Sequence, residues 1–512
     1  MTTAQSPGPQ PPDSFVIEEA TIAEIQTAMQ AQHLTSRHLV DAYLARIEAI
    51  DRDGPTLRSI IELNPDAARI ADALDAERKL RGPRGPMHGI PVLIKDNIST
   101  ADAMHTTAGS LALAGHPALY DAHIVERLRA AGAVILGKTN LSEWANLRSK
   151  RATSGWSARG GLTLNPYALD RNTSGSSSGS GAATSANLTT VAVGTETDGS
   201  IVSPASIHGL VGIKPTVGLV SRYGIIPIAK SQDTAGPMAR SVADAAILLT
   251  ALAGGDARDP VTKAAPSEDY TRHLDADGLR GARLGVVRAL FGDNERINDT
   301  IDAAIGVLRS RGAQIIDPGV LANADKYGDA ELTVLLYEMK DGLNRYFREF
   351  APHAPVQSIA ELIRWNDAHA ALELRYFGQE YLIEMERKGD LTQQEYLDAL
   401  ATCARYARTE GLDALFAKER LDAVIAPTGS TAWVTDFVNG DHSGASFSSP
   451  AAVAGYPHIT VPAGMVSGLP VGLSFVGPAF SEGRLIRYAY SFEQATHARR
   501  RPRYAADTAL EA

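Results

Sequence analysis

The chain has 512 residues, a formal net charge of −10 and a single cysteine, Cys403. Its composition, with 44% hydrophobic and 21% charged residues, is typical of a globular protein and excludes the disordered and fibrous classes. The negative net charge and the absence of a long run of Lys and Arg argue against nucleic acid as a partner. One cysteine cannot form an intramolecular disulfide or a thiolate metal site with a second cysteine.

The N-terminal residues 1–14 are rich in Pro, Ser and Gln, and they lack the basic start and apolar stretch of a secretory signal. We expect them to form a flexible tail. No stretch of the chain approaches the ~18 consecutive apolar residues that a membrane-spanning helix needs. We therefore expect a soluble, cytoplasmic protein without a membrane partner.

Three helices are expected near the N-terminus. A capping box at Thr21 and Glu24 predicts the start of the first, because each side chain can bond the other residue's backbone N–H. Thr35 or Ser36 caps a second helix that ends near Gly54, and a third spans about 66–80.

Short apolar runs then alternate with helices. Residues 90–95 form a buried strand candidate with Lys95 at its far end, and a helix at 121–131 leads into a strand at 133–136. This alternation predicts an α/β fold with a large mixed, mainly parallel β-sheet covered by helices on both faces.

The second half of the chain is helical and charged between about 262 and 425, and strands return at 423–427 and 458–462. Because strand candidates lie on both sides of this helical region, we expect one sheet with a peripheral helical layer. The sequence thus predicts a single domain over residues 15–505.

A run of Gly and Ser at 174–181 permits two interpretations. Such a run is usually a flexible linker. It also matches the motif G-x-S-x-G of a nucleophile elbow with Ser177 at its centre, although no apolar strand precedes it as that motif requires. The helix-forming residues 182–188 and a strand candidate at 190–193 follow directly, so we expect the run to lie inside a compact unit.

A second glycine cluster, at 194–200, ends in Ser200 and follows that strand candidate. The backbone N–H groups of Thr197, Asp198, Gly199 and Ser200 could converge there on a developing oxyanion. This arrangement predicts a site for acyl transfer. Ser176 precedes Ser200 by 24 residues, with one helix and one strand between, which is enough to fold the two serines together.

The sequence resembles the amidase signature family in several separate segments that occur in the family's order. These segments are 88–97, 175–181, 194–200, 209–216, 233–238, 454–457 and 468–473. The resemblance implies an amide hydrolase of the amidase signature fold that needs neither metal nor cofactor.

The resemblance assigns Ser200 as the nucleophile, Ser176 as a bridging serine that follows a cis peptide bond, and Lys95 as the base. A lysine can act as a base near neutral pH only where burial disfavours its charged form. Lys95 at the end of an apolar strand meets this condition. For Ser177 we favour a structural hydroxyl that holds the loop, with assistance to proton transfer as the alternative.

Two departures from the family pattern bear on the substrate. Asp198 stands where the family usually has Gly, and Val202 or Ser203 stands where an Arg commonly follows. Without that Arg, small dicarboxylic half-amides are disfavoured and neutral or longer substrates are favoured. Asp198 is expected either to accept a hydrogen bond from a substrate N–H or amino group, or to brace its own turn.

Within the family the chain most resembles the bacterial peptide amidases, in the segments 140–146, 154–161, 196–202 and 377–380. That resemblance implies release of ammonia from the C-terminal amide of peptides, with the helical region at about 262–425 supplying pocket walls. Ser154, Ser177 and Asp198 are the candidate substrate-binding residues.

Three other activities remain open: a general aliphatic or aryl amidase, an amidotransferase subunit that frees ammonia from glutamine for a partner, and a binding protein on an inactive scaffold. A metal-dependent hydrolase is disfavoured, because the 13 histidines form no H-E-x-x-H motif. The sequence does not specify the preferred side chain beside the amide, the cleavage of esters or anilides, the biological substrate or the oligomeric state.

Overall fold

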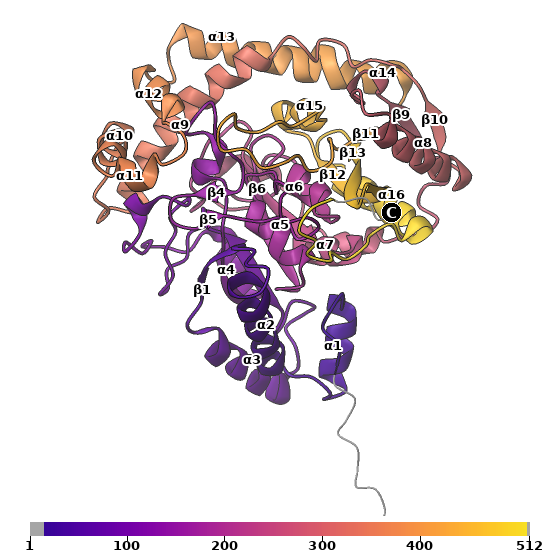
Figure 1. The fold of residues 1–512 in the computed structure, drawn as a ribbon. Helices are drawn as coiled ribbons and strands as arrows, with labels where there is room; N and C mark the ends of the chain where they lie inside the picture. Colours follow the sequence, from indigo (N-terminus) through magenta and orange to yellow (C-terminus); the bar gives the residue numbers. More distant parts are fainter. Residues whose placement is uncertain (1–14, 509–512) are drawn as a thin grey trace, which may run out of the picture.

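The computed structural model describes residues 15–508, so the tail predicted over residues 1–14 lies outside the described residues. An 11-stranded sheet runs through the molecule (Figure 1). In spatial order its strands are β1 (Ile60–Leu63), β3 (Val134–Thr139), β2 (Pro91–Lys95), β6 (Val191–Glu196), β8 (Thr234–Ala239), β7 (Val211–Lys214), β12 (His458–Val466), β13 (Leu469–Val476), β11 (Ala423–Pro427), β9 (Arg283–Val286) and β10 (Gln314–Ile316). A separate small hairpin pairs β4 (Trp156–Ser157) with β5 (Gly161–Leu162).

Parallel pairing occurs toward the two ends of the sheet. β2 pairs in parallel with β3 and β6, and β9 pairs in parallel with β10 and β11. Between these blocks, β8, β7, β12 and β13 form antiparallel pairs. The expected mixed α/β sheet is therefore confirmed.

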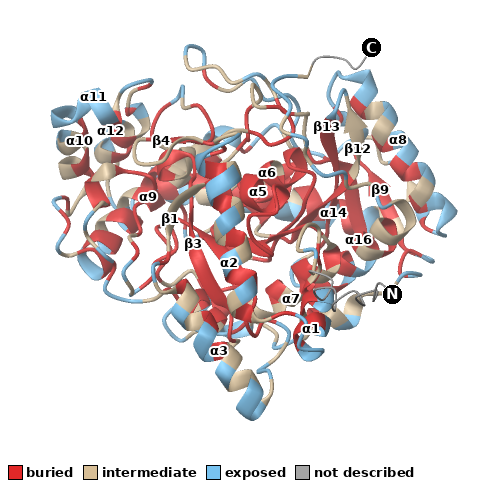
Figure 2. Ribbon diagram, turned by 60° about the horizontal axis from the view of Figure 1, so that its bottom comes forward, coloured by how far each residue is buried: buried red, intermediate tan, exposed pale blue. Residues whose placement is uncertain are grey.

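Two groups of helices pack on the strands of the sheet. One group consists of α5 (Ser178–Ser185) and α6 (Val202–Ile207), which contact each other and appear as buried helices in Figure 2. The other consists of α4 (His123–Ala130), α7 (Val242–Leu252), α8 (Glu295–Ser310) and α16 (Glu482–Thr496). Helices of both groups contact the same strands: α5 and α4 contact β3, α5 and α7 contact β8, and α6 and α16 contact β12. The sheet is therefore covered on both faces, as expected.

The N-terminal helices begin where the sequence signals place them. Thr21 and Glu24 form the predicted capping box of α1 (Ile22–Gln30), and Thr35 caps α2 (Ser36–Arg46). A π-helical turn extends α2 to Arg52, which explains the predicted end near Gly54. The third helix is α3 (Ala67–Arg81).

Helix α5 begins at Ser178, inside the Gly/Ser run and not after it. The run is therefore not a linker. A side chain at Gly179 would place its Cβ 2.6 Å from the backbone carbonyl oxygen of Asn140, and one at Gly181 would come within 2.6 Å of the His208 ring. The small residues let this helix approach the sheet closely, so its low helix propensity is offset by packing.

The helical region crosses one side of the molecule, orange in Figure 1. Its helices are α9 (Gly328–Phe350), α10 (Ile359–Ala368), α11 (Ala370–Glu373), α12 (Glu380–Arg387), α13 (Gln394–Cys403) and α14 (Asp413–Glu419), and α15 (Ser448–Ala454) lies later in the chain. The span expected to be helical also contains β10, the last strand of the sheet, and its neighbour β9. These strands have only four and three residues, too few for a clear pattern.

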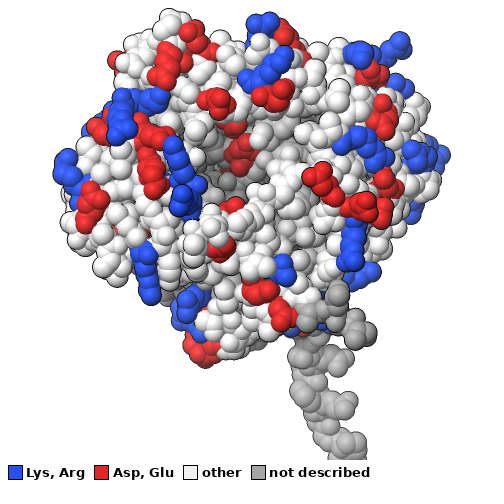
Figure 3. All heavy atoms as spheres, turned by 45° about the horizontal axis from the view of Figure 1, so that its top comes forward, with Lys and Arg blue, Asp and Glu red and all other residues white. Residues whose placement is uncertain are grey.

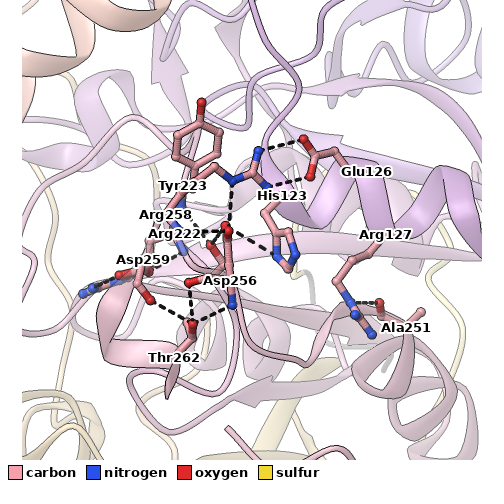
Figure 4. Close-up of polar contacts among 11 residues, drawn as sticks. His123, Glu126, Arg127, Arg222, Tyr223, Ala251, Asp256, Arg258, Asp259 and Thr262 are labelled. Carbon is pink, nitrogen blue, oxygen red and sulfur yellow. Dashed lines mark hydrogen bonds and ion pairs between the residues drawn. The ribbon is translucent and has the colours of Figure 1, made fainter. Parts of the chain in front are cut away.

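A cluster of paired charges, which we call the arginine clip, joins the segment 254–264 to the loop between β7 and β8 and to α4 (Figure 4). Arg222 donates from Nε and Nη2 to Asp259 at 2.8 and 2.7 Å. Arg258 donates to both Glu126 oxygens, at 2.9 and 2.6 Å, and to Asp256 at 2.9 Å.

Within residues 15–508, no helix has the length and apolar character needed to cross a membrane.

Candidate active site

Lys95 lies at the C-terminal end of β2, with β3 on one side and β6 on the other. Every residue of β2 is buried, and the Lys95 side chain has 0% exposure. Its Nζ lies 2.7 Å from Ser176 Oγ, 2.9 Å from Thr195 Oγ1 and 3.3 Å from the Thr195 carbonyl oxygen. The structure therefore brings two of the three predicted catalytic residues into direct contact.

The charge state of Lys95 follows from its burial. Desolvation lowers the pKa of Lys95 to about 7, although the negative charges of Asp233 and Glu196 partly oppose this shift. The contacts of Nζ suit the neutral amine, which has two N–H donors and one lone pair. The two Thr195 oxygens can accept the N–H groups, so the lone pair is left to face the hydroxyl of Ser176.

Ser176 follows a cis peptide bond from Gly175, as the family resemblance implies. The chain is tightly held at this point. A Cβ on Gly175 would lie 2.2 Å from Ser142 Oγ, and the Ser142 N–H donates to the Ser176 carbonyl at 3.1 Å. A side chain at position 175 would collide with Ser142, which favours glycine there. The Ser176 side chain is held in contact with Lys95.

Ser200 lies in the turn between β6 and α6, and this turn contains Gly199 with φ of +76°. Within the described residues, the N–H groups of Asp198, Gly199 and Ser200 donate no backbone hydrogen bond, and the Ser200 hydroxyl has no hydrogen-bond partner. Ser200 is joined to the other serines by the Ser177 N–H, which donates to the Ser200 carbonyl at 3.2 Å. The turn is thus next to Ser176, without a direct bond between the two hydroxyls.

Glu196 holds this turn in shape. Its buried carboxylate accepts the N–H groups of Ile201 and Val202, at 2.7 and 3.0 Å, and so ties the end of β6 to the start of α6. Burial raises the pKa of Glu196, and the charge of Lys214 opposes the shift. The donors of the turn are therefore arranged before any ligand arrives, which is what electrostatic stabilisation of an oxyanion requires.

Ser177 and Ser154 both bond to the protein itself. Ser177 Oγ donates to the Thr195 carbonyl at 3.0 Å, which agrees with the structural role that we favoured. Ser154 Oγ donates to Asp441 and accepts from Asn146 Nδ2 at 3.1 Å. It also lies 3.3 Å from the Cβ position of Gly175, one residue from Ser176. A substrate contact for either serine remains a prediction.

Asp198 bonds to residues from distant parts of the chain. Ser449 on α15 donates to its Oδ2 at 2.6 Å, and the carboxyl group of Glu331 on α9 lies within hydrogen-bonding reach. Asp198 therefore ties its turn to α15, and a contact between Asp198 and substrate remains a prediction.

Sequence reasoning missed three residues around Lys95, namely Asn97, Thr195 and Asp233. Thr195 receives hydrogen bonds from Lys95 and, at 2.9 Å, from Asn97 Nδ2. Asp233 accepts from Thr197 Oγ1 at 2.6 Å and from the N–H groups of Ile228 and Ala229. Burial raises the pKa of Asp233 to about 6, against these hydrogen bonds. All three lie inside segments that match the family, but their proximity depends on strand pairing.

Three segments that resemble the peptide amidases meet beside the site. The Arg148 guanidinium lies 4.3 Å from the Phe377 ring centre and 5.2 Å from that of Trp156. It also pairs with Glu143, which accepts the Ala158 N–H at 2.7 Å. The loop around Trp156 is thus packed against the helical region that we expected to form pocket walls.

The face of the molecule shown in Figure 3 is hollowed near its centre, and acidic side chains are visible inside the hollow. Among the described residues, no group of three or more His, Cys, Asp and Glu side chains is arranged to hold a metal ion.

Known proteins are similar to this chain in sequence and in fold. Residues 38–486 match the family model described as Amidase. A probable amidase of Arabidopsis thaliana is 43% identical over 96% of this chain and 93% of its own length. The native peptide amidase of Stenotrophomonas maltophilia is 52% identical, with a TM-score of 0.90 over 95% of this chain and 99% of that one.

A glutamyl-tRNA(Gln) amidotransferase subunit of Halorhodospira halophila is also similar, with 35% identity over 94% of this chain and 98% of its own. The family match covers most of the sequence, and the relatives align nearly end to end. The protein is therefore a member of the amidase signature family, whose enzymes hydrolyse amides.

Proposed function

We propose that this protein is a serine hydrolase that releases ammonia from the C-terminal amide of peptides, with Lys95, Ser176 and Ser200 as its catalytic residues. The observation that carries this proposal is the 2.7 Å contact between a buried, readily neutralised Lys95 and Ser176, next to the turn that holds Ser200. A serine hydroxyl needs a neighbouring base to become a nucleophile at neutral pH.

In the first step, the neutral Lys95 amine takes the Ser176 hydroxyl proton while Ser176 takes the proton of Ser200. The Ser200 oxygen forms a bond to the carbonyl carbon of the amide. The negative charge that develops on the carbonyl oxygen is stabilised by the N–H groups of Thr197 to Ser200.

In the second step, the carbon–nitrogen bond breaks and the proton returns through Ser176 to the leaving nitrogen. Ammonia departs, Lys95 is again neutral and the acyl group remains on Ser200 as an ester. Water then adds to this ester by the same proton route, which regenerates Ser200 and releases a carboxylic acid. No metal or cofactor takes part.

The peptide substrate is supported by the 52% identity to a peptide amidase and by the packing of the segments around Trp156 and Phe377. We propose that residues 15–505 form one amidase domain and that the helical region at about 262–425 supplies walls of its pocket. Ser154, Ser177 and Asp198 are the candidate contacts to substrate.

Ammonia release tests this proposal when C-terminally amidated peptides are compared with simple aliphatic and aryl amides at equal concentrations. We expect the peptide amides to have the highest kcat/KM. A fluorophosphonate should label Ser200 in the wild type but not in Ser200→Ala. Equal turnover of all amides would instead indicate a general amidase.

The similarity to an amidotransferase subunit supports a second candidate, release of ammonia from glutamine for a partner protein. The same ammonia assay separates the two functions. Turnover of glutamine only after a partner is added, with no turnover of peptide amides by the isolated chain, would favour the amidotransferase.

A further inference from the structure

We propose that Glu331 is a positioning residue of the active site: its carboxyl group shares a proton with Asp198 and so anchors the nucleophile turn, residues 197–200, to α9. This inference rests on the proposed function, because it concerns the turn that holds Ser200. Glu331 lies in the first turn of α9, 131 residues from Ser200, and no sequence motif pointed to it.

The two carboxyl groups lie within hydrogen-bonding reach of each other. Asp198 Oδ1 is buried without a hydrogen-bond partner in the described structure, whereas Oδ2 accepts from Ser449. Two ionised carboxylates cannot donate to each other, and their repulsion disfavours the doubly charged state. A single shared proton converts the repulsion into a hydrogen bond.

The surroundings of the pair favour this shared proton. Within residues 15–508 neither carboxyl group forms an ion pair with a lysine or arginine, although the charge of Lys214 acts on Asp198 without a direct contact. Burial, followed by the Asp198 charge, raises the pKa of Glu331 well above its usual range. Glu331 therefore keeps its proton at neutral pH and donates it to Asp198.

Further contacts connect Glu331 to the same turn. Gln232 Nε2 donates to Glu331 Oε1 at 2.8 Å and to the Thr197 carbonyl at 3.3 Å. Asp198 and Thr197 are thus both linked to α9 through Glu331. Because oxyanion donors must be held within fractions of an ångström, a link at this turn affects catalysis more than binding.

Other titratable groups face the pair from the elements packed around it. They are Glu196 on β6, Lys214 on β7, Tyr327 before α9 and Cys403 on α13. Burial lowers the pKa of Lys214 to about 8, so Lys214 is the competing source of an alkaline effect.

The test measures kcat and KM from pH 6 to 10.5 with an N-acetylated peptide amide, which has no titrating group of its own. We expect wild-type kcat to fall on the alkaline side as Glu331 loses its proton. Glu331→Gln, which keeps a permanent N–H donor, should lack this fall. Glu331→Ala should lower kcat by about tenfold to a hundredfold at all pH values with little change in KM.

The matched control is Glu338→Gln, the same substitution two turns further along α9. Glu338 is buried and accepts from Ser231 and Tyr396, which lie outside the turn. Its pH profile should keep the alkaline fall. An alkaline fall that persists in Glu331→Gln would assign it to Lys214 and overturn the proposal, and so would a change confined to KM, which indicates substrate binding.

Thermal unfolding separates this proposal from the proposed function. A carboxyl group whose pKa is raised by folding contributes stability at low pH, and this contribution is lost as pH rises through the raised pKa. The wild type should therefore lose stability relative to Glu331→Gln as pH increases. This result is expected even if no amide is hydrolysed, and parallel stability curves would contradict the shared proton.

Discussion

The residues around Lys95 and those of the arginine clip both form polar clusters, but they have opposite effects on the charged forms of their side chains. In the clip, guanidinium groups meet carboxylates: Arg222 binds Asp259 through two bonds, and Arg258 binds Glu126 in the same manner. Lys95 meets only hydroxyl and carbonyl oxygens, and no ion pair to it exists among residues 15–508. One cluster stabilises charged side chains, and the other disfavours a charge.

The pKa values follow this difference. Burial disfavours the ionised forms of Arg222 and Asp259, but their ion pair outweighs it, raising the pKa of Arg222 and lowering that of Asp259. At Lys95 burial is not outweighed, and the pKa falls to about 7. A paired charge cannot exchange its proton near neutral pH, whereas an unpaired buried lysine can. The absence of an ion-paired carboxylate is therefore what would allow Lys95 to serve as the proposed base.

Lys95→Met should have the largest effect, because it removes the base and keeps the apolar volume of the side chain. We expect kcat at pH 7 to fall by about 10³-fold to 10⁴-fold. Steady-state ammonia release measures this loss, and Lys95→Ala should recover part of its activity near pH 10, where hydroxide replaces the base.

The matched control for this variant is Lys138→Met on the neighbouring strand β3. Lys138 is equally buried, but its Nζ donates to the Ile98 carbonyl and to Thr106 Oγ1, away from the serines. The folded fraction of this variant should keep kcat within a few-fold of wild type. Equal losses in the two variants would mean that Lys95 acts only through stability.

Ser176→Ala should have the next largest effect, because it breaks the proposed proton path between Lys95 and Ser200. We expect a loss in kcat of about 10³-fold, compared with less than about tenfold for Ser177→Ala. The two serines are adjacent and both buried, but only Ser176 contacts Nζ. The ratio of the two kcat values is the measurement, and a reversed order would assign the proton path to Ser177.

The pH dependence of kcat/KM should follow the ionisation of Lys95. Activity should rise with an apparent pKa near 7, which makes it about a hundredfold lower at pH 5 than on the plateau. The negative charge of Asp233 raises the pKa of Lys95, so Asp233→Asn should move the acid limb to lower pH. Buffer-independent pH profiles of both proteins check the sign, and a shift to higher pH would exclude this coupling.

The sequence predicted the local parts of the fold and of the site because local patterns determine them. An apolar strand ending in Lys95, a Gly turn ending in Ser200 and a capping box at Thr21 each depend on residues close together in the chain. The resemblance to a known family then assigned Ser176, which the formal G-x-S-x-G match did not favour over Ser177.

The parts that the sequence did not predict depend on long-range packing. Asp233 reaches the Lys95 region because β8 pairs with β6, and Glu331 is linked to the nucleophile turn because Gln232 bonds to both. Similarly, the helix α5 begins within a Gly/Ser run whose composition favours a loop, because only small side chains fit between the sheet and the His208 ring. No pattern within a few residues specifies such contacts.

Arg222→Ala should have the smallest effect on catalysis, because it breaks a charge pair that has no part in proton transfer. The Arg222 and Asp259 side chains are 16% and 9% exposed, so the remaining Asp259 charge is left largely buried without its partner. We expect a loss in the free energy of unfolding of about 2 kcal/mol, below that of a fully buried pair. Urea denaturation measures this loss, and kcat at 25 °C should stay within about twofold of wild type.

Because ion pairing lowers the pKa of Asp259, the difference in stability should shrink as pH falls and that carboxylate gains a proton. A large loss of kcat with unchanged stability would instead connect the clip to the chemistry, and the contrast between the two clusters would fail.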